Sequence, residues 1–231
     1  MAFYQFIQTA GSREAHVYIY GDLVTERWSE EEVSALSFKN QLDGLDVDTL
    51  HVHVDSYGGA VSEGFAIYNA IKAHPAKVIT YADGFVASAA VYPFLAGDER
   101  IASPLSAFFL HRVLTSCYGN AEELRRAADE AEQLNDIGLN AFAAAGVDKD
   151  TILQLEEAET WLSPDKALEL GIATAISEPV TASGPAQSVR SMIAQLLTSA
   201  PAPAPTPEPI PAPAPPKQTL FNILSKSFNN I

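Results

Sequence analysis

Ser88 is the residue of this chain best suited by its surroundings to act as a nucleophile. It lies among small residues in the segment 84–90 (GFVASAA), after a predicted strand and where a helix is expected to begin. A serine on a tight strand-to-helix turn can be reached by a bulky acyl group without obstruction. The free N–H groups at the helix start would stabilise the oxyanion formed on attack at a carbonyl. Taken alone, such a serine more often only caps or packs a helix.

Two further features accompany Ser88 in chain order. Gly58 and Gly59 follow a predicted strand, and without side chains their backbone N–H groups can approach a ligand closely as a second oxyanion donor. His111 stands at the end of an apolar strand over residues 107–110, where a side chain is presented at a sheet edge. The order Gly-Gly, serine, histidine therefore favours serine-dependent peptide hydrolysis with His111 as general base.

Repeated strand, loop and helix segments would position these residues. We expect an α/β fold with a largely parallel sheet and covering helices. Strands are predicted over 16–20, 49–54, 77–82, 99–102 and 107–110, and helices from Ser29 onward and over 63–73, 87–96, 120–145 and 163–171. Charge is mixed into the apolar positions of 120–145, which is typical of a protruding arm. Pro164 in the first turn and Gly171 at the end bound the last of these helices.

The C-terminal quarter differs in composition from the rest. We expect a peptidase domain over 1–178, a short helical extension over 179–200 and a Pro/Ala-rich linker over 201–216. The tail 217–231 follows. Its apolar residues predict a docking segment that becomes helical on a partner, with a disordered end as the alternative. They are Leu220, Phe221, Leu224 and Phe228.

Composition narrows the classes of partner. The 231 residues carry a formal charge of −15, which makes nucleic acid and anionic membranes poor partners and favours a protein, peptide or small-molecule substrate. The one cysteine, Cys117, excludes an internal disulfide. The N-terminus does not look like a signal peptide, and no apolar run reaches eighteen residues. A cytoplasmic protein without a membrane span is therefore expected.

Residues 55–173 resemble the proteolytic subunit family of the Clp protease, ClpP. The matching segments are 55–59 (DSYGG), 64–69 (GFAIYN), 87–90 (ASAA), His111, 159–163 (ETWLS), Ala167 and 170–171. The resemblance implies a spiral of β-α-β units, as in ClpP and the crotonases, with a protruding handle helix over 120–145. It also implies homo-oligomeric rings, heptameric in form, whose active sites face a chamber.

The resemblance assigns site residues as well. It implies Ser88 as nucleophile, His111 as base and Glu159 as the third triad residue, where family members usually carry Asp. Gly58 and Ala89 would supply the oxyanion N–H groups. Gly59 and Leu114 would contact substrate. Tyr57 departs from the proline common in this loop.

The ETWLS segment and the appended tail resemble the ClpP-related head maturation proteases of tailed phages and prophages. This subgroup implies cleavage of scaffold or capsid proteins in host cytoplasm or an assembling procapsid, without an ATPase partner. The alternatives are a housekeeping Clp subunit that works with an ATP-dependent unfoldase, a crotonase-like acyl-CoA enzyme, or a non-catalytic assembly module.

Three other patterns are interpreted as non-functional. His51 and His53 share one strand face without accompanying carboxylates, so no metal is predicted. Cys117 lacks basic neighbours that would activate a thiol. The Gly58-Gly59 loop lacks the Gly-Lys-Ser/Thr ending of a phosphate loop, and no cofactor is expected.

Overall fold

The computed structural model describes residues 6–8, 11–24 and 34–178 of the chain. The expected start of a helix at Ser29 and the segments 179–200, 201–216 and 217–231, with the proposed docking tail, lie outside the described residues. Within the described part, no helix is both long and apolar enough to cross a membrane.

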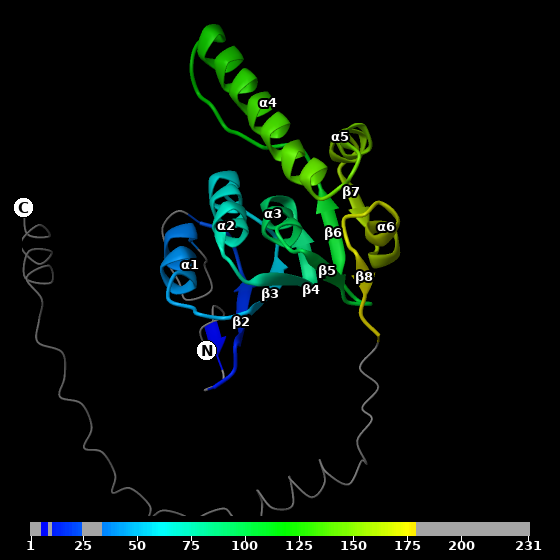
Figure 1. The fold of residues 1–231 in the computed structure, drawn as a ribbon. Coiled ribbons are helices and arrows are strands. Elements are labelled where there is room, and N and C mark those ends of the chain that lie inside the picture. The colour runs from blue at the N-terminus through cyan, green and yellow to red at the C-terminus, as the bar shows by residue number, and fades with distance from the viewer. Residues whose placement is uncertain (1–5, 9–10, 25–33, 179–231) are drawn as a thin grey trace, which may run out of the picture. The chain divides into compact units, whose positions relative to one another are not determined.

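The described residues form one sheet of eight strands (Figure 1). The spatial order is β1-β2-β3-β4-β5-β8, and β6 branches off to pair with β4 and β7. The β1–β2 and β6–β7 pairs are antiparallel and the others are parallel, which confirms a largely parallel α/β sheet. The strands are β1 (Phe6–Gln8), β2 (Glu14–Tyr20), β3 (Thr49–Ser56), β4 (Lys77–Ala87), β5 (Glu99–Ala102), β6 (Ala107–Leu110), β7 (Thr160–Leu162) and β8 (Ala175–Ile176).

Strand β4 continues five residues beyond the end predicted at residue 82. Its register with β3 shifts between Val54 and Ser56, and the Asp55 side chain fills the irregularity by accepting a hydrogen bond from the Phe85 N–H at 2.9 Å. The Asp-Gly pair at 83–84 thus bends the strand instead of ending it. As a result, the first half of β4 pairs with β5 and the second half with β6.

The helices cover the sheet and supply one projecting arm (Figure 1). Helix α4 extends away from the sheet, as expected of a handle. Its N-cap, Asn120, forms a capping box with Glu123, which explains why the helix starts there. The helices are α1 (Ala35–Leu42), α2 (Val61–Ala73), the 3₁₀ turn η1 (Ser88–Ala90), α3 (Val91–Leu95), α4 (Ala121–Ala144), α5 (Lys149–Glu157) and α6 (Pro164–Glu169).

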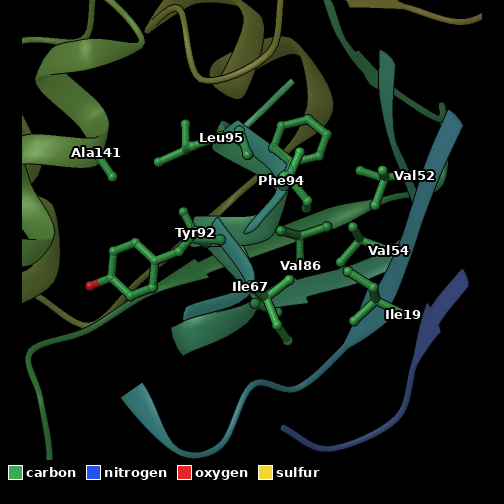
Figure 2. Packing of buried hydrophobic residues seen from close by; sticks show 14 of the residues in the cluster. Ile19, Val52, Val54, Ile67, Val86, Tyr92, Phe94, Leu95 and Ala141 are labelled. Atoms are coloured by element: carbon green, nitrogen blue, oxygen red, sulfur yellow. The ribbon is translucent and has the colours of Figure 1, made fainter. Parts of the chain in front are cut away.

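Apolar side chains from the central strands and from α2 and α3 make the core (Figure 2). Val54 of β3 and Val86 of β4 face Ile67 of α2, and all three are fully buried. Phe94 of α3 packs edge-on against Phe108 of β6 with ring centroids 5.2 Å apart. Burial of this kind stabilises a domain by roughly 25 cal/mol for each Å² of apolar surface removed from water. The short helix α3, which begins just after Ser88, is therefore anchored by its own side chains.

A buried arginine joins the C-terminal part of the body to the sheet. Arg100 of β5 is 7% exposed, and its guanidinium donates to the carbonyl oxygens of Ile172, Gly97, Ala145 and Gly171 at 2.8 to 3.2 Å. Burial lowers the pKa of Arg100 from its usual value. Because the guanidinium has five donors, one side chain can satisfy carbonyls from three separate segments.

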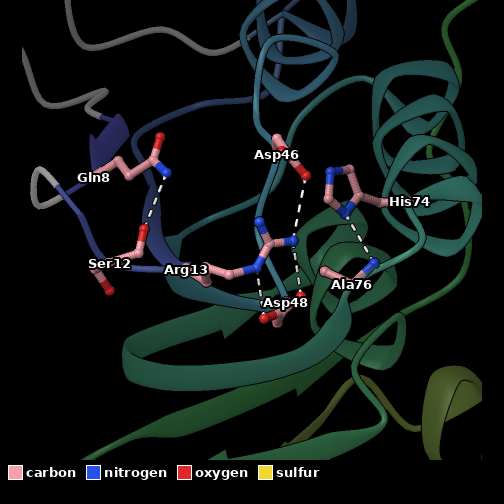
Figure 3. A network of polar contacts seen from close by, with 7 residues as sticks. All are labelled: Gln8, Ser12, Arg13, Asp46, Asp48, His74 and Ala76. Atoms are coloured by element: carbon pink, nitrogen blue, oxygen red, sulfur yellow. Dashed lines mark hydrogen bonds and ion pairs between the residues drawn. The ribbon is translucent and has the colours of Figure 1, made fainter.

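An exposed ion pair lies just before the first residues of β2 and β3 (Figure 3). Arg13 contacts Asp48 with two of its nitrogens, at 2.6 and 2.9 Å, and Asp46 at 3.3 Å. The guanidinium lowers the pKa of Asp48. Exposed ion pairs of this kind contribute little stability, about 0–1 kcal/mol. The register of β2 against β3 is therefore set mainly by the hydrogen bonds and buried side chains of the two strands.

Candidate active site

Ser88 and His111 meet in the structure. The Nε2 atom of His111 lies 2.7 Å from the Oγ atom of Ser88, although 23 residues separate them in the chain. Ser88 follows the end of β4 and His111 follows the end of β6, and the second half of β4 pairs in parallel with β6. The carboxyl ends of two neighbouring parallel strands thus place the hydroxyl beside the imidazole.

The backbone at Ser88 is in an unusual conformation. Its φ angle is 55°, in the left-handed region that non-glycine residues rarely adopt. Strained, exposed turns of this kind between a strand and a helix present nucleophilic side chains in several hydrolase folds. The expected helix over 87–96 is therefore divided, since η1 begins at Ser88 and α3 only at Val91.

The glycine loop packs directly beneath Ser88. A β-carbon at Gly58 would lie 2.7 Å from Cβ of Ser88 and 2.8 Å from N of Ala89, so any side chain there would collide with the turn. A β-carbon at Gly59 would lie 2.3 Å from the carbonyl oxygen of Leu23. Both glycines have positive φ, 93° and 137°. Close packing against the Ser88 turn and Leu23 thus requires glycine at both positions.

The structure distinguishes the two glycine N–H groups. The Gly58 N–H donates to Oγ of Ser56 at 3.0 Å and is already satisfied. The Gly59 N–H has no acceptor among the described residues, and Gly59 lines the cavity beside Ser88. The expectation that Gly58 is an oxyanion donor therefore conflicts with its hydrogen bond, and Gly59 is the better-placed donor.

Packing and one hydrogen bond hold the segment that carries His111. The imidazole stacks on Phe109 with ring centroids 5.3 Å apart, and Phe109 stacks on Trp161 of β7. Two residues past the histidine, the Val113 N–H donates to Oδ1 of Asn135 at 2.7 Å. Asn135 is a buried residue of α4, 6% exposed. The arm helix thereby fixes the chain next to His111.

Glu159 and His111 each flank the β6–β7 ladder, but their side chains are not bonded. The last pair of the ladder is Leu110 with Thr160, so His111 follows one member of that pair and Glu159 precedes the other. The Glu159 side chain is exposed and its φ angle is 48°. Among the described residues, Nδ1 of His111 has no hydrogen-bond partner.

A cavity of about 710 Å³ opens at the Ser88–His111 pair. Ala89, Gly59 and Leu114, which the family resemblance names as site residues, line it, and Leu114 is 78% exposed. Sequence reasoning did not single out Glu156, Tyr92 and Trp161, which also line the cavity. Trp161 lay within the recognised 159–163 segment, but nothing in the sequence set Glu156 apart from its acidic neighbours.

The other residues considered lie away from this cavity. His51 and His53 share a sheet face with His16, whose ring stacks on that of His51 at 4.5 Å. His53 Nδ1 contacts Asp83 at 2.7 Å. Within the described ranges, no group of three His, Cys, Asp or Glu side chains is arranged to hold a metal. Cys117 is a free, exposed thiol.

Comparison with known proteins shows the family of the chain. The Clp protease family matches residues 4–180. The chain is 28% identical over 159 residues to an ATP-dependent Clp protease proteolytic subunit 2 of Treponema denticola, covering 67% of this chain and 78% of that protein. It is 34% identical over 142 residues to the subunit of the same name in Treponema pallidum, covering 59% of this chain and 71% of that protein.

A solved structure shows the same fold. The ClpP1 N165D mutant from Listeria monocytogenes superposes with a TM-score of 0.62 at 25% identity, covering 71% of this chain and 92% of that one. The family match over residues 4–180 includes Ser88 and His111. The chain therefore belongs to the Clp protease family and is a serine-type peptidase.

Proposed function

We propose that Ser88 is the nucleophile and His111 the general base of this peptidase. The 2.7 Å contact between Oγ and Nε2 carries the assignment. Ser88 attacks the scissile carbonyl while His111 takes the hydroxyl proton, and the imidazolium then returns that proton to the leaving amine. Water repeats the sequence on the acyl-enzyme, which releases the acid product and restores Ser88.

We assign the oxyanion hole to the N–H groups of Gly59 and Ala89. Gly59 has an unused donor and borders the cavity, and Ala89 follows the nucleophile at the start of η1. Donors fixed by the backbone need not reorganise when charge develops, and one such donor contributes roughly 10²–10³ in rate.

Glu159 is our candidate for the residue that orients His111. Support comes from the β6–β7 ladder, whose last pair, Leu110 with Thr160, is directly followed by His111 on one strand and preceded by Glu159 on the other. Because the side chain is exposed and unpaired with the imidazole, a rotation of Glu159 toward Nδ1 is part of the proposal. That rotation would complete a Ser-His-acid triad as substrate or a neighbouring subunit covers the site.

We also propose that the chain assembles into rings, heptameric as the ClpP resemblance implies, with the cavities facing a chamber. Helix α4 carries apolar side chains that the single chain leaves in water. Leu124, Leu134 and Ile137 are 47%, 36% and 52% exposed. Association that covers such a helix face removes this apolar surface from water. Light scattering of the purified protein tests this, and a monomer at micromolar concentration would contradict it.

Within the family, we favour a head maturation protease acting on scaffold or capsid proteins, in host cytoplasm or an assembling procapsid. The support is the 159–163 segment and the 51 residues that follow the family match, from 181 to 231. The housekeeping alternative predicts that proteins are degraded only with an ATP-dependent unfoldase. Cleavage of an unfolded protein such as casein by the purified oligomer alone would favour the maturation role.

A fluorophosphonate probe tests the assignment of Ser88. The wild-type protein should be labelled, and Ser88→Ala should not. Ser62 lines the same cavity, so Ser62→Ala is the matched control and should be labelled normally. His111→Gln should lower the labelling rate by about 10³ or more. Equal labelling of Ser88→Ala and wild type would remove Ser88 from the role.

A further inference from the structure

Glu156 is part of the wall of the cavity that contains Ser88 and His111. Glu156 comes from α5, near its C-terminal end, and is 6% exposed. Its Oε2 atom is buried and has no hydrogen-bond partner among the described residues. An unpaired buried carboxylate is costly, so an acid placed here needs either a proton or a cation from outside.

Among the described residues, no cationic side chain forms an ion pair with Glu156. The charge of Arg112 acts on Glu156, but its guanidinium pairs with Glu157 at 3.3 Å. Among the described residues that line the cavity there is no lysine or arginine, and the other carboxyl is that of Glu130 on α4. The cavity is therefore acidic in character, with His111 as its one basic group.

The rest of the wall is suited to an aliphatic chain. Apolar residues of α3 and α4 line it, namely Val91, Ala127, Ala131, Leu134 and Phe142. Tyr92 extends from α3 toward α4, where a β-carbon at Gly138 would collide with its hydroxyl (Figure 2). Burial and the nearby Glu156 raise the pKa of Tyr92, so its hydroxyl stays neutral and can donate a hydrogen bond. An apolar passage beside an acid matches a lysine or arginine side chain.

We propose that Glu156 is a specificity-determining residue, which selects substrates with a lysine or arginine side chain next to the bond cleaved by Ser88. The aliphatic stem lies along the apolar wall and the cationic group pairs with the Glu156 carboxylate. This inference rests on the proposed role of Ser88. Its physical basis is that the incoming cation supplies the partner that the buried carboxyl lacks.

The preference for a cationic side chain should depend on pH. Burial raises the pKa of Glu156 to about 7, and the charge of Arg112 opposes this. Tyr92 of α3 also interacts electrostatically with Glu156. The other titratable groups that line the cavity are Glu130 of α4 and His111 after β6. Only the ionised form pairs with a cation. The ionised fraction of a group with a pKa near 7 rises roughly tenfold from pH 6 to pH 8, and so should the preference for lysine over leucine.

Two phosphonate probes measure this preference directly on the full chain. Diphenyl α-aminophosphonates with a lysine-like or a leucine-like side chain react with the catalytic serine, and the ratio of their labelling rate constants reports the selection. The wild type should favour the lysine-like probe. Glu156→Gln should lower the ratio at least tenfold, with little change for the leucine-like probe. Glu130→Gln, the other cavity carboxyl, should change the ratio by less than twofold.

Other outcomes of these labelling experiments would contradict the role of Glu156 or that of Ser88. An unchanged ratio in Glu156→Gln, or an equal fall in Glu130→Gln, would refute the role of Glu156. If Glu156→Gln does not fold, the wild-type pH profile decides, because a ratio that is flat from pH 6 to 8 contradicts the proposal. A wild type that reacts with no fluorophosphonate would instead refute the catalytic role of Ser88, and the specificity inference with it.

Discussion

The backbone of Gly58 passes so close to Ser88 that a β-carbon on the glycine would lie 2.7 Å from that of the serine. Gly58→Ala should therefore displace the turn that carries Ser88. We expect fluorophosphonate labelling to slow at least tenfold, with a lower melting temperature. Gly146→Ala is the matched control, because Gly146 has a similar φ of 84° and open space at the β-carbon position. It should cost only the strain of positive φ, about 1 kcal/mol, and leave labelling unchanged.

Removal of the acid proposed to orient His111 should slow catalysis without weakening substrate binding. For Glu159→Gln we expect kcat to fall by roughly 10²–10⁴, with KM within threefold of the wild type, because the imidazolium loses its stabilising charge. Glu157→Gln, at an exposed acid two residues earlier, should leave kcat within threefold. Equal kcat values for Glu159→Gln and wild type on a peptide substrate would exclude Glu159 from the triad.

Asn135 connects the arm helix to the chain beside the active site. Asn135→Ala removes the acceptor of the Val113 N–H and should lower the free energy of unfolding by about 1–3 kcal/mol. Labelling of Ser88 should also slow, since Val113 is two residues from His111. Asn140→Ala removes an exposed bond to Lys149 from the same helix and should do neither. Urea unfolding and probe kinetics on both variants separate these outcomes.

The free energy of unfolding of the substrate-free enzyme should depend on pH through the ionisation of Glu156. Its pKa is about 7 when folded, against an ordinary value of 4.5. The unfolded chain thus releases this proton at lower pH than the folded one. The contribution of Glu156 to the free energy of unfolding should fall as pH rises from about 4.5 to 7, by on the order of 2 kcal/mol, and stay level above.

Glu156→Gln should lack that decline. Urea unfolding at pH 5 and pH 8 gives the comparison, and the variant should gain stability relative to wild type only at the higher pH. The same difference between variant and wild type at both values would show that the Glu156 carboxyl titrates normally.

The sequence predicted which residues come together at the site, Ser88 and His111. It predicted the short strands and hydrogen bonds around them less well. Apolar strands followed by Ser88 and His111 were visible as patterns, so the pairing could be expected. Short elements escaped prediction, since β7 and β8 have three and two residues and too few positions to show a period. Helix α5 was also missed. The hydrogen bond that occupies the Gly58 N–H depends on Ser56, and no spacing rule distinguishes two adjacent glycines.

The buried carboxyl escaped prediction for a similar reason. Glu156 and Glu157 are adjacent acids in the sequence, yet one is 6% exposed and the other pairs with Arg112 at the surface. Which of them faces inward depends on the rotation of α5 against α4 and β6, and that is a property of tertiary packing.

Strand β4 is divided between two partner strands, β5 along its first half and β6 along its second. Nucleophile and base are both attached to the ladder formed by its second half with β6, whereas the first half belongs to the opposite branch of the sheet. A shift of this ladder would move Ser88 and His111 together, so their contact tolerates deformation in the first half of β4. The segment after His111 is also bonded to α4 through Asn135, so a tilt of the arm remains a route by which the imidazole could be displaced.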